Sequence, residues 1–192
     1  MERIIPILVV TILSCQVDIK QLPQPRNSST INLAASNLPL YFGKFEIYSA
    51  ESYNLSSAWK YTIKTILKHN RVFFDIYDLN EETIFKPDSY ILDLAIYPKY
   101  NDDYNYWWTW PNVYPFTGTW PVQVRTGKYE ISIDYTLSKD GKIIKQNKVT
   151  ESDSLTIYIF GTYRTSDLEK MIEVTNLKVL DKCAKDIYSN LQ

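Results

Sequence analysis

The segment from Lys128 to Val149 constrains the fold more than any other part of the sequence. From Lys128 to Leu137 apolar and polar residues alternate cleanly, which is the pattern of a strand with one buried face. Asp140-Gly141 follows, and Asp-Gly favours a two-residue turn that joins antiparallel strands. Residues 143–149 return as the second strand. One face of the first strand is predicted to hold Tyr129, Ile131, Ile133 and Tyr135, and the other Glu130, Ser132 and Asp134.

Four other stretches resemble strands, because they are rich in Tyr, Phe, Ile and Val. They are residues 38–48, 72–77, 90–97 and 155–160. The first two flank a predicted helix, and this order favours a right-handed crossover between parallel strands. Asp153-Ser154 is predicted to turn the chain before the last strand.

Two segments carry apolar residues at helical spacing. The first stripe comprises Leu55, Trp59, Ile63, Ile66 and Leu67, and the helix is expected to end near His69. The second helix begins at a capping box formed by Ser166 and Glu169. Its stripe runs to Leu191 and includes Cys183, which we expect to be buried.

Residues 97–120 hold ten aromatic side chains and four of the five tryptophans. Pro111 and Pro115 exclude a regular helix there, and proline is also excluded from central strands. The stretch is therefore predicted to be a long, ordered, aromatic loop between strands. The whole chain is predicted to be α+β, with a mixed β-sheet and two helices packed on one face.

Three roles are open for this aromatic stretch. It can pack on its own sheet, present its rings to a protein or a lipid interface, or stack on the sugar rings of a glycan. Neighbouring residues of an extended chain point to opposite sides, so at least one tryptophan is expected to be exposed. The residues predicted to contact a partner are Trp107, Trp108, Trp110, Tyr114 and Trp120.

Composition argues against several classes of function. The net charge is about −1 with no basic block, so nucleic acid is not an expected partner. The sequence lacks the usual nucleophile, zinc and phosphate-loop motifs, and we predict no enzymatic activity and no cofactor. The single histidine, His69, excludes a multi-histidine metal site and is expected to complement the helix dipole. Oxygen ligands for calcium could come from Asn101, Asp102, Asp103 and Asn105, although a polar turn is the favoured interpretation.

The N-terminus has the pattern of a secretory signal. An apolar run from Ile4 to Leu13 is too short to cross a bilayer as a helix, and Ser14-Cys15 follows it. We predict a signal peptide over residues 1–14, a lipidated Cys15 with a flexible tether over 15–37, and a single domain over 38–192. If Cys15 carries lipid, Cys183 is the remaining thiol.

The string Ile12-Leu13-Ser14-Cys15 resembles the lipobox of bacterial lipoproteins, in a loose form similar to that of spirochaetes. The order of elements is similar in outline to outer-membrane assembly lipoproteins of the lipopolysaccharide-assembly and curli-channel types. This resemblance implies acylation (palmitate) at Cys15, a lipid anchor in the outer membrane facing the periplasm, and a protein partner in the envelope. We therefore expect a role in envelope assembly or maintenance. The alternative is a surface-exposed binding protein or adhesin that meets a glycan or host ligand.

Overall fold

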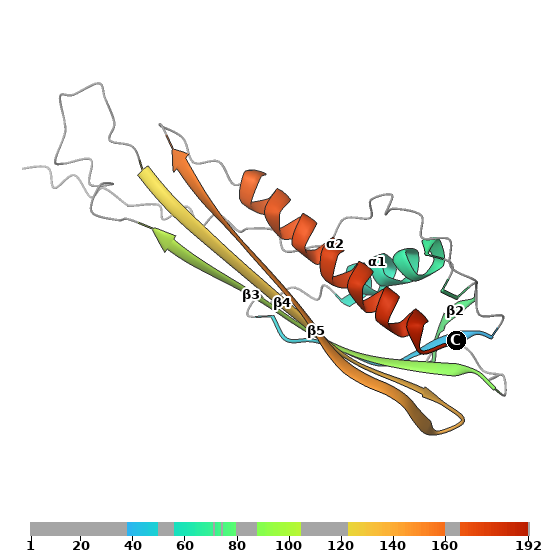
Figure 1. Cartoon of the computed structure of the whole chain (residues 1–192). Coiled ribbons are helices and arrows are strands. Elements are labelled where there is room, and N and C mark those ends of the chain that lie inside the picture. The colour runs from blue at the N-terminus through green and yellow to red at the C-terminus, as the bar shows by residue number, and fades with distance from the viewer. Residues whose placement is uncertain are drawn as a thin grey trace, which may run out of the picture.

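The computed structural model describes residues 38–49, 56–70, 72–73, 75–79, 88–104, 123–159 and 166–191. Five strands form one mixed sheet in the order β2-β1-β3-β4-β5, and the two helices pack on one face of it, as predicted (Figure 1). The elements are β1 (Leu40–Ile47), α1 (Ser56–His69), β2 (Ile76–Asp78), β3 (Tyr90–Tyr104), β4 (Gln123–Lys139), β5 (Lys142–Ile159) and α2 (Ser166–Ser189).

The parallel part of the sheet is centred on β1. This strand pairs in parallel with β2 on one side and with β3 on the other, so the predicted strand–helix–strand crossover is confirmed. The predicted stripe of α1 is buried against the sheet from Trp59 to Leu67. His69 lies in the last turn of α1, where a cation interacts favourably with the helix dipole.

The antiparallel part is a long arm of β3, β4 and β5, with α2 lying along it (Figure 1). These strands have 15, 17 and 18 residues. The turn between β4 and β5 has φ angles of 51° at Asp140 and 75° at Gly141, which confirms the two-residue turn predicted from Asp-Gly.

Strand β3 continues beyond its predicted end at residue 97 into the stretch predicted to be a loop, so the loop prediction is wrong for residues 98–104. Tyr48 N donates to Ile96 O at 2.8 Å, and the next bond of a parallel ladder would come from the nitrogen of residue 98. Residue 98 is proline, which has no N–H. Pairing with β1 therefore stops at Pro98, while β3 continues along β4 with Pro98 opposite Ile131.

The same extension corrects the interpretation of residues 101–103 as a turn. They are part of β3, and the carboxylate of Asp102 forms an ion pair with Arg125 on β4. The described part of the chain holds no group of three or more His, Cys, Asp or Glu side chains that could bind a metal ion. Asn105 lies outside the described residues.

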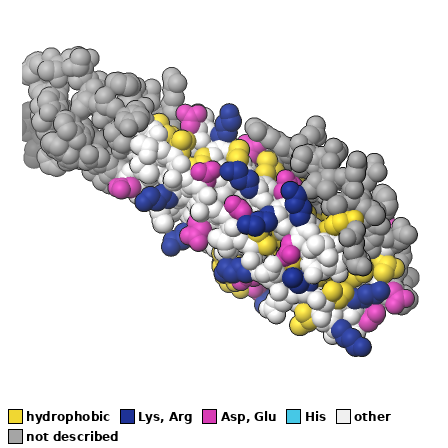
Figure 2. Space-filling view, viewed as in Figure 1, with side chains coloured by type: hydrophobic (Ala, Val, Ile, Leu, Met, Phe, Trp, Pro, Cys, Tyr) yellow, Lys and Arg dark blue, Asp and Glu magenta, His cyan; other side chains and the backbone are white. Residues whose placement is uncertain are grey.

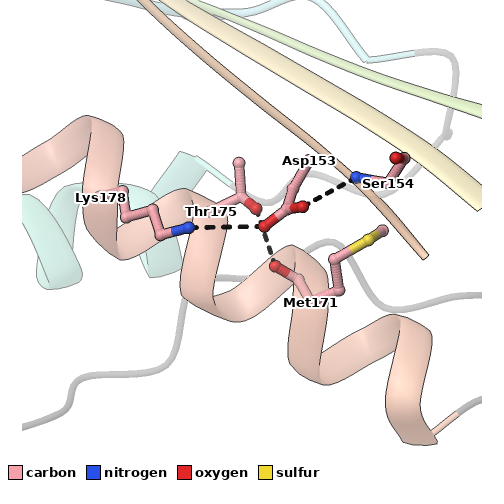
Figure 3. Close-up of polar contacts among 5 residues, drawn as sticks. All are labelled: Asp153, Ser154, Met171, Thr175 and Lys178. Atoms are coloured by element: carbon pink, nitrogen blue, oxygen red, sulfur yellow. Dashed lines mark hydrogen bonds and ion pairs between the residues drawn. The ribbon is translucent and has the colours of Figure 1, made fainter.

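Strand β5 is continuous, so the turn predicted at Asp153-Ser154 is also wrong. Both residues keep their places in the ladder, Asp153 opposite Tyr129 and Ser154 opposite Lys128. The carboxylate of Asp153 accepts a hydrogen bond from Ser154 N at 2.9 Å and lies 3.4 Å from Lys178 Nζ on α2 (Figure 3). Instead of turning the chain, Asp153 links β5 to α2.

The core lies between the sheet and the two helices. Tyr129, Ile131, Ile133 and Tyr135 are buried in it as the alternation predicts, and so is Cys183. Buried polar groups in this layer are paired. Tyr129 Oη donates to Asn176 Oδ1 across it at 2.8 Å, and within α2 Thr175 Oγ1 donates to Met171 O at 2.9 Å (Figure 3). On the surface shown in Figure 2, basic and acidic side chains are interspersed over the described part.

Candidate functional site

None of the residues predicted to bind a partner or lipid can be placed. Cys15, Trp107, Trp108, Trp110, Tyr114 and Trp120 all lie outside the described residues. The strands that flank residues 105–122 end side by side, because Tyr104 at the end of β3 pairs with Arg125 near the start of β4.

The described residues instead define a hollow on the sheet face opposite the helices. Its volume is about 490 Å³, within the range of about 300–1,000 Å³ that is typical of small-ligand sites. The ladder places Glu46, Ala95, Asp134 and Lys148 in one row across β1, β3, β4 and β5. Ala95 is the smallest side chain of this row, so the sheet is hollowed there. We call this site the Tyr48 hollow; its lining is Lys44, Glu46, Tyr48, Asp93, Leu94, Ala95, Tyr97, Asp134, Tyr135, Thr136, Gln146, Asn147 and Lys148.

Two tyrosines form one wall of the Tyr48 hollow. The rings of Tyr48 and Tyr97 are stacked, with centroids 4.7 Å apart and planes 5° from parallel. Lys148 Nζ lies 5.4 Å from the centroid of the Tyr97 ring, within the range of a cation–π contact. Tyr97 therefore contacts both Tyr48 and Lys148, whereas Tyr48 is 52% exposed, so that part of its ring is accessible to a ligand.

A chain of polar contacts fixes the Tyr48 ring. Tyr48 Oη donates to Glu46, and Glu46 Oε1 lies 2.9 Å from Lys44 Nζ. The hydrogen bonds from Tyr48 and then Lys44 lower the pKa of Glu46, and the bond to Glu46 raises the pKa of Tyr48. At neutral pH the phenol thus stays a donor and the carboxylate an acceptor, and the ring is held in one orientation.

Two further carboxylates, those of Asp93 and Asp134, line the Tyr48 hollow. Asp93 Oδ1 accepts from Lys44 N at 2.7 Å. Lys148 Nζ lies 3.5 Å from Asp134 Oδ1, an ion pair too long to be a good hydrogen bond. Asp134 Oδ1 is buried and has no hydrogen-bond partner in the structure. Asp134 lies on the polar face as predicted. The prediction that its carboxylate is solvated is wrong for Oδ1, which is buried.

A second hollow, which we call the arm hollow, lies on the same face further along the arm. Its volume is about 400 Å³, and hydroxyl, amide and charged groups line it. Asn101 on β3 is six residues beyond Ala95, a distance of about 20 Å at roughly 3.4 Å per residue. The lining residues are Asn101, Lys128, Tyr129, Glu130, Ser152, Asp153 and Ser154.

On the helix side, a polar cluster around Asp186 joins α2 to the arm. Tyr135 Oη and Asn147 Nδ2 each donate to Asp186 Oδ2 at 2.5 Å. Partial burial pushes the pKa of Asp186 up, but these two hydrogen bonds together with the charge of Lys145 outweigh it and lower the pKa. The cluster holds the helix on the sheet, and two of its members, Tyr135 and Asn147, also line the Tyr48 hollow.

Sequence reasoning missed the Tyr48 hollow, although part of its signal was available. Alternation along β3 and β4 already assigns Ala95, Tyr97 and Asp134 to the polar face. What the sequence lacked was the position of Tyr48, which depends on the register of β1 against β3.

The fold defines a class: an α+β domain with a mixed five-stranded sheet and two helices. A protein-family model matches residues 6–188, and the chain belongs to the family that this model describes. No curated protein matches the sequence. None of the described helices has the length and apolar character needed to cross a membrane.

Several solved structures are similar to this chain. A Xanthomonas campestris protein of family DUF330 is 10% identical, with 88% of this chain and 94% of that chain covered and a TM-score of 0.47. A neuraminyllactose-binding hemagglutinin homolog from Helicobacter pylori is 8% identical, with 88% and 92% covered and a TM-score of 0.46. Rare lipoprotein B from Shewanella oneidensis is 12% identical, with 80% and 92% covered and a TM-score of 0.37.

Proposed function

We propose that this protein is a non-enzymatic lipoprotein of the bacterial outer membrane that faces the periplasm and acts in envelope assembly or maintenance. Its N-terminus supports the anchor, because an apolar run ends directly at Ser14-Cys15. Two or more acyl chains give stable membrane anchoring, whereas one chain gives marginal binding.

One observation carries the binding role: the sheet face opposite the helices presents a fixed, half-exposed tyrosine. Tyr48 is stacked on Tyr97 and bonded to Glu46, so little side-chain freedom is lost when a ligand covers it. Exposed aromatic side chains are frequent in binding hot spots.

A second contact surface is proposed for residues 105–122, which lie outside the described residues. Residues 105–122 connect the paired ends of β3 and β4, and they include Trp107, Trp108 and Trp110. In this proposal they contact the envelope partner, and Tyr114 and Trp120 extend the same surface.

The anchor is tested by metabolic labelling with a fatty acid. The parent protein should incorporate label and sediment with membranes, and Cys15→Ala should lose both properties. Cys183→Ala is the matched control, because it removes the other thiol and should keep the label. An unlabelled parent, or label retained in Cys15→Ala, would contradict the anchor.

Orientation and partner contact need separate measurements. Protease added to intact cells should leave the domain uncut if it faces the periplasm. Digestion would instead support the surface-exposed binding protein. Crosslinking to the envelope partner should be lost when Trp107, Trp108 and Trp110 are all changed to alanine. It should survive in Tyr61→Ala, a control at an exposed tyrosine on α1; equal capture by both variants would refute the contact.

A further inference from the structure

The Tyr48 hollow has the chemistry of a saccharide site. Its wall is an aromatic ring, and the C–H face of a sugar ring packs on such a surface. Acceptors and donors for sugar hydroxyls surround it on the neighbouring strands. They include the carboxylates of Asp93 and Asp134, the hydroxyl of Thr136 and the amide of Gln146.

The charges of the Tyr48 hollow favour a neutral ligand. Lys44 is paired with Glu46 and Lys148 with Asp134, so both cations are already opposed by carboxylates. Asp93 adds a further negative charge, and no described lysine or arginine forms an ion pair with it. An anionic ligand would therefore meet excess negative charge.

The two hollows together favour an extended ligand. They lie on the same face along β3, β4 and β5, and the row of Tyr97, Ser132 and Thr150 separates them. The arm hollow repeats the same hydrogen-bonding chemistry, with Asn101, Ser152 and Ser154 in its lining. One ligand that reaches both must be a chain of several rings.

We propose that the sheet face opposite the helices binds a neutral, linear oligosaccharide, with one sugar ring stacked on Tyr48. The Tyr48 hollow holds this ring, and the arm hollow holds the chain further along the strands. The inference goes beyond the lipid anchor and does not depend on it. A negative result in the fatty-acid labelling test would therefore not contradict saccharide binding.

Calorimetry on the full-length protein tests the proposal, in a detergent without a sugar head group. The probes are two neutral linear tetrasaccharides, cellotetraose and tetra-N-acetylchitotetraose, and the acidic trisaccharide sialyllactose. At least one tetrasaccharide should bind, and more tightly than sialyllactose. Binding of neither tetrasaccharide, or of sialyllactose alone, would overturn the proposal.

Three variants locate the site on the molecule. Tyr48→Ala should weaken tetrasaccharide binding at least tenfold, whereas Tyr61→Ala, at an exposed tyrosine of α1, should leave it unchanged. Ala95→Gln removes no contact and fills the floor of the hollow, and it should abolish binding while the protein stays folded by circular dichroism. Full binding by Tyr48→Ala or by folded Ala95→Gln would refute the assignment.

The extension along the arm has its own readout. Asn101→Ala should weaken binding of the tetrasaccharide severalfold and leave binding of the corresponding disaccharide unchanged. Equal loss for both lengths, or for neither, would confine the ligand to the Tyr48 hollow and contradict the extended mode. If the same face captures a protein through Tyr48 while no saccharide binds, the saccharide assignment is wrong.

Discussion

The carboxylate of Asp93 occupies space that opens only because residue 43 is glycine. A Cβ atom on Gly43 would lie 2.2 Å from Asp93 Oδ1 and 3.0 Å from Ile91 Cγ2. Asp93 Oδ1 also accepts from Lys44 N at 2.7 Å. Between Phe42 and Phe45 the register shifts, so that Gly43 and Lys44 together oppose Asp93. This is a β-bulge, and the carboxylate holds it in place.

Gly43→Ala should therefore destabilise the fold by about 1–3 kcal/mol, the usual cost of overpacking. Urea unfolding measures it as a lower midpoint. The cost should shrink in an Asp93→Ala background, where the clashing carboxylate is gone. An equal cost in both backgrounds would show that Asp93 is not the cause.

The bulge also explains which parts of the site the sequence could predict. Alternation identifies the polar face of β3 and β4, and Asp-Gly identifies their hairpin turn with β5, because both are local patterns. The stacking of Tyr48 on Tyr97 depends on the register between β1 and β3, which the bulge shifts by one residue. Register is a property of two strands, so neither strand alone carries it.

On the arm, local turn signals were misleading because strand pairing outweighs them. Pro98 and Asp153-Ser154 each suggest a break, yet both lie inside strands that are paired along their length. The backbone N–H that Pro98 lacks would point toward β1, and β1 has ended there. Pairing with β4 outweighs the local preference at both places.

A further prediction concerns the outer edge of β5. Pairing along the arm directs the backbone N–H groups of Lys148 and Ser154 away from β4. Side chains cover both, since Asn147 Oδ1 accepts from Lys148 N and Asp153 Oδ1 from Ser154 N, each at 2.9 Å. Exposed strand edges promote association with other chains. Asp153→Ala should therefore raise the oligomer fraction in light scattering at high protein concentration.

Glu151→Ala is the matched control for this edge. Glu151 Oε1 lies 2.8 Å from Lys182 Nζ on α2, as Asp153 lies near Lys178, so both variants lose one lysine contact to the helix. Only Asp153 accepts from a backbone N–H of the strand edge. Equal association in the two variants would assign the effect to the lost ion pair.

The Asp186 cluster gives the fold a pH dependence. Asp186→Ala leaves the hydroxyl of Tyr135, a residue 1% exposed, without its acceptor, at a cost of about 1–3 kcal/mol. Because the pKa of Asp186 is lowered in the fold, its charge stabilises the protein above the ordinary pKa of about 3.9. This contribution is lost as the pH falls through the lower, folded value.

Urea unfolding at pH 7 and pH 3 measures this dependence. The difference between parent and Asp186→Ala should be larger at pH 7. Tyr135→Phe serves as the control, since it removes the donor and leaves no unpaired hydroxyl, and it should cost less than Asp186→Ala. A difference that stays constant between the two pH values would contradict a role for the Asp186 charge.

The thiol of Cys183 should report on unfolding. Cys183 is 5% exposed, and burial, together with the nearby charge of Asp186, raises its pKa to about 12. Thiolate is the reactive form, so the folded protein should react very slowly with a thiol reagent at pH 8. In Cys15→Ala, where Cys183 is the remaining thiol, reactivity should appear at the urea midpoint measured by circular dichroism. Rapid reaction without urea would mean that α2 opens locally at this position.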